Sequence, residues 1–269
     1  MDTPLNNFLI DDPRLYRMSM MFGRGAVYIV VRRLVGEPEM IVSRIEISPA
    51  ASSPAQGIEE IIYSNPVILQ PFKKVDIVFD GGFTLVAPID ADTEDIDKIF
   101  PLNERLTTLA TPIDSRNKLV FRVDTNLLNF IRRTFDAIVP THSLAILGRY
   151  FEHRARLGNS GKMYVNISKD AMDVLIFNQI GLAMASSYSC PDINDAAYYA
   201  LAAAHTAGFD MASDEIRISG NSDRRAELMP VLRKFSRSVM PAIFPSADVN
   251  YSSVAMTAPF PLIVMPLCE

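Results

Sequence analysis

Apolar residues near the start of the chain gather in three short runs that polar and glycine-containing turns separate. The runs are "RLYRMSMMF", "AVYIVV" and "EMIVSRIEI", with turns at residues 23–25 and 36–38. Runs of this length that are rich in β-branched and aromatic residues favour strands. Strands joined by short turns must be antiparallel, so residues 14–47 are predicted to form a three-stranded meander.

The same pattern returns in the second half, where "KMYVNISKDAMDVLIFNQIGLAMASSYS" (162–189) predicts three more strands joined by tight turns. After each meander the apolar spacing changes to three and four residues, which is typical of helices. The first such helix is expected near residues 57–64, and the second starts near Pro191 and ends at Gly208. The strand "EIRIS" and a helix that Ser222 would cap follow. The order meander, helix, strand, helix therefore occurs twice.

The region between the two copies is more varied. "VDIVFDGGFTLVAP" predicts a hairpin, because Asp80-Gly81-Gly82 fits a tight turn between two apolar runs. An acidic helix near 90–100, a strand "KLVFRV" and two helices follow, the second with Thr141 as its cap and residues 144–155 as its body. The linker at residues 158–161 predicts a domain boundary, with one unit at residues 1–159 and the other at residues 160–269. The C-terminal tail contains several prolines and is expected to be irregular or an edge strand.

Composition narrows the class of protein. The 269 residues are 49% hydrophobic and 21% charged, as in folded globular proteins, and the net charge of −5 does not favour a nucleic-acid partner. The two cysteines, Cys190 and Cys268, lack metal-ligand spacing and indicate reduced thiols. The N-terminal residues do not resemble a secretion signal, and no apolar run reaches the roughly 20 residues of a membrane span. A cytoplasmic protein without a membrane span is expected.

The duplicated order of elements resembles the βββαβα unit of the actin-like ATPase superfamily, which has a ribonuclease H-like fold. The segments "VYIVVRRL", "FTLVAP", "NISKDAMDVLIF" and "EIRISGNSDRRAEL", with the terminal "LCE", also resemble the bacterial family domain of unknown function 3822. The resemblance covers nearly the whole chain. It implies an α/β protein with mixed sheets and two actin-like lobes.

In the superfamily, ATP lies between the two halves, held by two hairpins and a glycine-rich strand–helix turn. The resemblance places the first hairpin at Gly23, Arg24 and Gly25, the second at Lys169 and Asp170, and the turn at Gly220, Asn221 and Ser222. Carboxylates that hold Mg²⁺ are expected in the two hairpins, but Ser19 and Asn166 stand at those positions. Asp170 and Asp173 lie several residues beyond Asn166. An acid displaced by an odd number of residues along a strand would point to the other face of the sheet. The resemblance therefore implies a degenerate nucleotide site with no metal, and ATP stays open as a ligand.

Other candidate chemistry is sparse. The three histidines lack metal spacing, and we interpret them as structural or solvated. Arg224 and Arg225 stand near a helix start, where they are either solvated or bind an anion. Tyr198 and Tyr199, together with Met18, Met20 and Met21, are expected to form an exposed apolar patch for a protein partner.

The sequence thus predicts a non-catalytic protein of actin-like fold that acts through contacts with an unidentified protein partner. The alternative is a divergent ATP-binding protein, an ATPase or a phosphotransferase that uses Lys169, Asp170 and the turn at residues 220–222. A scaffold that docks on a membrane partner, as in pilus or secretion assemblies, is a third interpretation. The sequence also leaves a homo-oligomer open.

Overall fold

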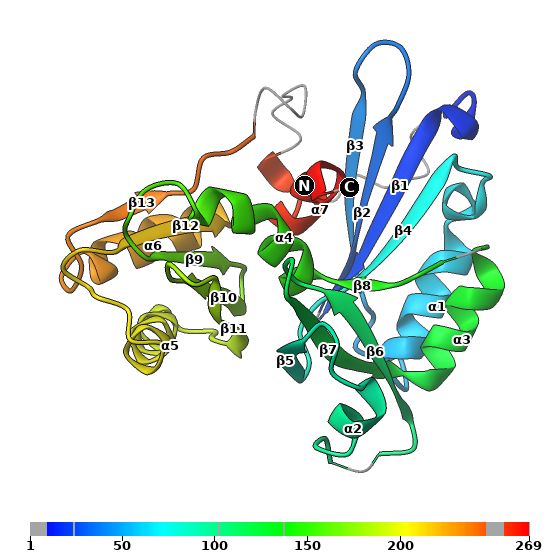
Figure 1. The fold of residues 1–269 in the computed structure, drawn as a ribbon. Coiled ribbons are helices and arrows are strands. Elements are labelled where there is room, and N and C mark those ends of the chain that lie inside the picture. Colours follow the sequence, from blue (N-terminus) through cyan, green and yellow to red (C-terminus); the bar gives the residue numbers. More distant parts are fainter. Residues whose placement is uncertain (1–9, 24, 102, 137, 246–255, 269) are drawn as a thin grey trace.

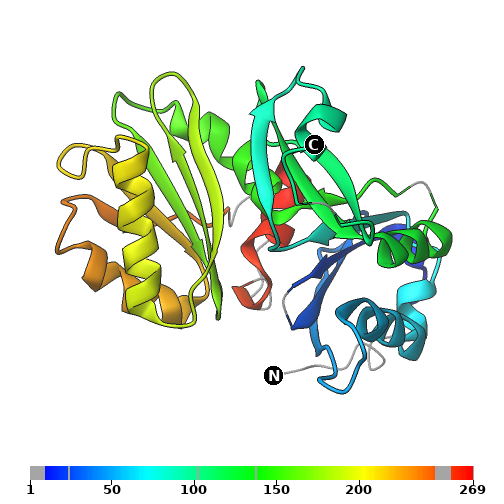
Figure 2. The ribbon, with the colours of Figure 1, turned by 90° about the horizontal axis from the view of Figure 1, so that it is seen from below.

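Two five-stranded sheets dominate the computed structural model, which describes residues 10–23, 25–101, 103–136, 138–245 and 256–268. They stand side by side as two lobes (Figures 1 and 2). The strand order is β3-β2-β1-β4-β8 in the first lobe and β11-β10-β9-β12-β13 in the second. The predicted α/β class, with mixed sheets and a duplicated module, is confirmed.

The two lobes contain their elements in the same order. The first contains β1 (Tyr16–Phe22), β2 (Ala26–Arg33), β3 (Met40–Glu46), α1 (Pro54–Ser64), β4 (Lys74–Phe79), α3 (Thr125–Thr134), β8 (Thr141–His142) and α4 (Ser143–Ala155), with 3-10 turns at Pro13–Leu15 and Pro66–Leu69. The second contains β9 (Lys162–Ile167), β10 (Ala171–Phe177), β11 (Leu182–Ser189), α5 (Ile193–Thr206), β12 (Glu215–Gly220), α6 (Ser222–Leu232), β13 (Val239–Pro241), α7 (Phe260–Val264) and a 3-10 turn at Met265–Cys268. In each lobe the first three strands are antiparallel, and the last two run parallel to the first.

An insertion interrupts the first lobe between β4 and α3. It consists of β5 (Thr84–Pro88), α2 (Thr93–Asp97), β6 (Leu106–Pro112) and β7 (Asn117–Asp124), with the three strands in the antiparallel order β5-β7-β6. The hairpin predicted around Asp80–Gly82 is wrong, because β4 pairs with β1 and β8 while β5 pairs with β7. Gly81 and Gly82 do adopt positive φ angles of 79° and 86°, but they turn the chain from one sheet into another.

Side-chain caps fix the starts of most helices. The carboxylates of Asp124 and Asp192 accept backbone N–H groups at the starts of α3 and α5, as short polar residues do at N-caps. Helix α4 is capped by the ring of His142 rather than by Thr141, and α6 by Asn221 rather than Ser222, so both predicted caps are wrong by one residue. The tail is also helical where an edge strand or irregular chain was expected, since Phe260–Val264 form α7.

Each sheet has one face covered by the helices of its own lobe. In the first lobe, Met18, Met20 and Ile29 pack with residues of α1 and α3. In the second lobe, Val165 and Ile218 pack with the alanine stripe of α5 and with α6. The small side chains of that stripe allow α5 to lie close to the sheet.

The other faces of the two sheets share one hydrophobic core, which we call the interlobe core. Helices α4 and α7 lie between the lobes (Figures 1 and 2) and supply most of it. Its members come from the first sheet (Met21, Val30, Val78), the insertion (Ile113, Leu119), α4 (Leu144, Ala145, Ile146, Leu147, Tyr150, Phe151, Ala155), the second sheet (Tyr164, Leu175, Phe177) and the C-terminal helices (Phe260, Leu262, Val264, Met265). The rings of Phe151 and Tyr164 stack with centroids 3.8 Å apart, which joins α4 directly to the second sheet.

Across the residues that the structure describes, no helix is both long and apolar enough to cross a bilayer.

Candidate functional site

The candidate site lies at the carboxyl ends of the parallel strands. In sheets of this kind, ligands bind where such strands end. In the first lobe the chain leaves β1 at Gly23 and β4 at Asp80, and in the second lobe it leaves β9 at Ser168 and β12 at Asn221. We call Gly23 and Gly25 with residues 80–82 the first turn pair, and residues 168–170 with 220–222 the second turn pair.

The two turn pairs share their backbone hydrogen bonds. Asp80 N donates to Phe22 O at 3.1 Å, and Asn221 N donates to Ile167 O at 2.7 Å in the equivalent place. The hairpins are closed by equivalent hydrogen bonds. Gly23 N donates to Ala26 O at 3.0 Å, and Ser168 N donates to Ala171 O at 2.8 Å. The duplication therefore extends to the local geometry of the turns.

The predicted site residues divide between these turns. Gly23 and Gly25 belong to the first turn pair, whereas Arg24 lies outside the described residues. Lys169, Asp170, Gly220, Asn221 and Ser222 all belong to the second turn pair. Lys169 and Asp170 are exposed at the hairpin tip.

Gly220 is required by the contact of β12 with β9. Its φ is 94°, which favours glycine, and a Cβ there would overlap the backbone of Ile167. The next residue, Asn221, uses its side-chain oxygen to accept the N–H groups of Asp223 and Arg224 at 3.1 and 3.0 Å. This capping occupies N–H groups at the start of α6 that could otherwise bind an anion.

Arg224 is also engaged within its lobe. Its guanidinium donates to the carbonyl oxygen of Cys190 at 2.9 Å and lies 3.7 Å from the carboxylate of Glu227. Its side chain is mostly buried, so the interpretation of Arg224 as a solvated arginine is wrong. The bond to Cys190 ties α6 to the end of β11.

The sequence reasoning missed the true position of the acid in the second lobe. Asp173 lies directly opposite Asn166 in the β9–β10 ladder and therefore on the same face of the sheet. The carboxylate is 7% exposed and accepts Asn166 Nδ2 at 3.1 Å and Ser187 Oγ at 2.6 Å. The argument that an odd displacement changes the face holds along one strand, but the hairpin turn reverses the chain and brings Asp173 back beside Asn166.

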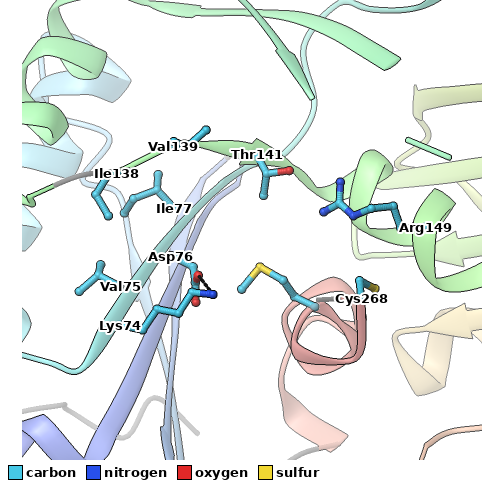
Figure 3. A pocket seen from close by; sticks show the side chains of 10 residues that line it. Lys74, Val75, Asp76, Ile77, Ile138, Val139, Thr141, Arg149 and Cys268 are labelled. Carbon is cyan, nitrogen blue, oxygen red and sulfur yellow. Dashed lines mark ion pairs between the residues drawn. The ribbon is translucent and has the colours of Figure 1, made fainter. Parts of the chain in front are cut away.

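A comparable arrangement occurs in the first lobe. Ser19 pairs in register with Asp76 of β4, and its hydroxyl donates to the Asp76 carboxylate at 2.9 Å. Arg17 Nε lies 2.5 Å from the same carboxylate, and the arginine is only 5% exposed. Asp76 also lines a cavity of about 300 Å³ (Figure 3), where Lys74 lies beside it on β4. Arg149 of α4 and Cys268 of the C-terminal turn line the same cavity. The sequence gives no signal for the pairing of Ser19 with Asp76, because the two residues are 57 positions apart.

Asp80 is the second acid of the first lobe that the sequence reasoning missed. Its Oδ1 accepts the hydroxyl of Ser143 at 2.6 Å, and its Oδ2 lies 3.9 Å from the position that a Cβ on Gly23 would take. Beside it, His142 is fully buried, with Nδ1 accepting Leu144 N at 3.1 Å and Nε2 3.0 Å from Gly81 O. Burial lowers the pKa of His142, so the ring is neutral and carries its proton on Nε2.

The donor set does not fit a magnesium–triphosphate. Within the described part of the chain, no group of three His, Cys, Asp or Glu side chains could hold a metal ion. Asp76, Asp80 and Asp173 each accept hydrogen bonds inside their own lobe, and Asp76 also faces a buried arginine. A bound metal would have to displace these partners before it could use the carboxylates.

Many solved structures share the architecture, among them the following two. A Bacteroides thetaiotaomicron protein of actin-like ATPase fold and unknown function is 20% identical, with a TM-score of 0.77 over 87% of this chain and 94% of that one. A PilM–PilN type IV pilus biogenesis complex contains a chain that is 12% identical, with a TM-score of 0.57 over 95% of this chain and 98% of that one. At these identities the similarity shows the fold alone, and it confirms the predicted actin-like fold.

No curated protein shows significant sequence similarity to the chain. The model of one protein family, described as protein of unknown function DUF3822, matches residues 7–239. That match covers most of both lobes, including both turn pairs. The chain therefore belongs to the DUF3822 family, as its resemblance predicted.

Proposed function

We propose that this protein is a non-catalytic member of the actin-like fold that acts through protein contacts, with a degenerate nucleotide site. The observation that supports this most directly is the hydrogen bonding at and beside the turn pairs. Asp76, Asp80 and Asp173 and the cap of α6 are already paired inside their own lobes. An ATPase needs such groups to be available for the metal, the phosphates and the attacking water.

The electrostatics of Asp76 support the same proposal. A carboxylate that accepts a charge-assisted bond from a buried arginine is already neutralised. Breaking a buried pair of this kind by removing one partner is costly, because the other charge is left without compensation. Magnesium would therefore have to compete with Arg17 for Asp76, which already forms a buried ion pair.

The proposed contact surface is on the second lobe. Tyr188 and Tyr199 stack with their ring centroids 4.9 Å apart, and Tyr198, which is 67% exposed, packs edge-on against Tyr199. The methionines expected beside these tyrosines are instead buried in the first lobe, so that part of the predicted patch is wrong. Tyrosine is enriched where proteins meet, and one neighbour of the same fold is a chain of a PilM–PilN type IV pilus biogenesis complex.

The nucleotide part of the proposal is tested by titrating the purified protein with Mg-ATP. A ligand at 100 times its Kd stabilises a protein by about 2.7 kcal/mol, which corresponds to a rise in Tm of roughly 5–10 °C for a chain of this size. We expect no such rise and no phosphate release in the same samples. A saturable rise in Tm together with hydrolysis would support the divergent ATPase instead.

The contact part is tested by photocrosslinking in the cells that make the protein. A photoreactive phenylalanine replaces Tyr198 in one variant and Tyr63 in the matched control, an equally exposed tyrosine on α1 of the first lobe. We expect a defined adduct from position 198 and none from position 63. A second copy of this chain in the adduct would identify a homo-oligomer. Equal adducts at both positions, or none at position 198, would contradict the proposed surface.

A further inference from the structure

A second cavity, of about 350 Å³, lies where both lobes meet. One wall is the turn between β6 and β7, with Asp114 and Arg116, and a second is the last turn of α4, with Glu152 and Arg156. The third wall is the β10–β11 turn of the second lobe, residues 177–182. The volume is at the lower end of the range for small-molecule sites. The cavity is lined by the turn that follows β10, whereas the hairpin tip of the second turn pair precedes β10, so the two sites lie at opposite ends of this strand.

The acids of this cavity are already engaged. Asp114 Oδ1 accepts the backbone N–H groups of Arg116 and Asn117 at 2.8 and 2.6 Å, and the side-chain amide of Asn117 bonds to both carboxylate oxygens. Glu152 accepts the hydroxyl and N–H groups of Ser115 at 2.5 and 3.1 Å and pairs with Arg156 Nη2 at 2.8 Å. The carboxylates thus shape the walls and leave little accepting capacity for a ligand.

The groups that remain available are donors. Among the described residues, no acceptor receives a hydrogen bond from the Arg116 guanidinium, and no carboxylate forms an ion pair with it. This side chain lies against Gly181, where a Cβ would overlap the guanidinium, so the glycine lets an arginine of the first lobe reach a turn of the second. Arg156 uses only Nη2 in its bonds to Glu152 and Ser115. A guanidinium with free N–H groups matches the two oxygens of a carboxylate.

The floor of the cavity is apolar. Phe177 and Ala155 are buried there, and Leu182 is half-buried beside them. A ligand therefore needs an apolar body as well as its acid group. The nearby charges of Asp114 and Glu152 disfavour a second negative charge on the ligand, which selects against phosphate and dicarboxylates.

We propose that this interlobe cavity binds a small organic monocarboxylate. Its carboxylate accepts hydrogen bonds from Arg116 and Arg156, and its apolar body rests on Phe177, Ala155 and Leu182. The ligand would contact the insertion, α4 and the second lobe together, so its binding would stabilise one relative arrangement of the two lobes. This inference does not depend on the proposed function.

The test uses the full chain with benzoate as the probe and ligand-observed NMR as the readout. A probe of this size binds weakly, with a Kd of the order of 1 mM. Benzamide, a neutral analogue of the same shape, and inorganic phosphate are measured in parallel. We expect saturable binding of benzoate, with benzamide and phosphate at least tenfold weaker.

Variants assign the site. Arg116→Gln is expected to weaken benzoate binding at least tenfold, whereas Arg105→Gln, an exposed arginine elsewhere on the insertion, should leave it unchanged. Both changes are on the surface, and an unchanged Tm would confirm that each variant folds. Benzoate binding that is absent, or that survives Arg116→Gln, would overturn the proposal. Equal binding of benzamide or tighter binding of phosphate would also overturn it, because neither fits the monocarboxylate class.

Discussion

His142 shows how a single residue joins several parts of the first lobe. Its ring caps α4, contacts the carbonyl oxygen of Gly81 and packs edge-on against Phe121, with centroids 5.2 Å apart. Only the neutral ring can accept the N–H of Leu144 and donate to Gly81. Protonation would replace the acceptor at Nδ1 with a donor that faces another donor.

The lowered pKa of His142 predicts a pH dependence of stability. In the unfolded chain a histidine binds a proton below about pH 6.5, whereas the folded chain resists protonation, so the unfolded state gains protons first as the pH falls. The free energy of unfolding should therefore decrease by up to about 1.2 kcal/mol between pH 7 and pH 5.5 from this residue alone. Denaturant unfolding at the two pH values measures the change.

The matched variants are His142→Asn, which keeps a capping oxygen but cannot titrate, and His205→Asn at an exposed helix end. The first should remove this part of the pH dependence, although it lowers stability at both pH values. The second should retain it. An unchanged pH dependence in His142→Asn would show that the ring is not the group that resists protonation.

Among the elements, α4 and α7 have the largest influence on how the lobes are joined. Each is the last helix of its module, and each leaves its own sheet to enter the interlobe core. Phe151 of α4 stacks on Tyr164 of the second sheet, and its ring centroid lies 6.0 Å from that of Phe260 in α7. The two lobes are thus expected to unfold as one cooperative unit.

Replacing Phe151 with alanine tests this expectation. Truncating a buried phenylalanine costs about 3–5 kcal/mol, whereas Phe235→Ala, at a phenylalanine that is 56% exposed, should change stability by roughly 0.5 kcal/mol or less. Both are measured by denaturant unfolding followed by tyrosine fluorescence and circular dichroism. A loss of less than 1 kcal/mol for Phe151→Ala, or transitions that differ between the two probes, would show that the interlobe core does not join the lobes.

The elements that the sequence predicted correctly are those with strong local patterns. Both meanders, the alanine-striped α5 and the acidic α2 follow from spacing and turn residues. The segment 106–112 was missed as a strand because its two leucines, Leu106 and Leu109, are three residues apart, which does not match the two-residue alternation of a strand. The two apolar runs around Asp80–Gly82 were joined into one hairpin because a tight turn looks the same whether its strands pair with each other or enter different sheets.

On the scale of the whole molecule, the duplication could be predicted and the site could be predicted only in part. The order of elements places Gly23 and Ser168 at equivalent hairpins and Asp80 and Asn221 at equivalent strand ends, and the structure gives each of these two pairs the same backbone hydrogen bonds. The order of elements could not place Asp76 beside Ser19 or Asp173 beside Asn166, because each acid lies on a neighbouring strand. Which residues lie opposite each other depends on strand register, and register is decided by packing across the whole sheet.

The division of the chain at residue 159 stays a prediction, but the interlobe core limits what either half could do alone. During synthesis, α4 leaves the ribosome about a hundred residues before Phe260 and Leu262 do. The second sheet is made next, so the apolar face formed by Leu144, Leu147 and Phe151 is at first uncovered, and it still lacks α7 once that sheet is complete. The newly made first half would therefore expose the apolar surface of α4 for several seconds at ordinary translation rates. The interlobe core is complete only after α7 has been made.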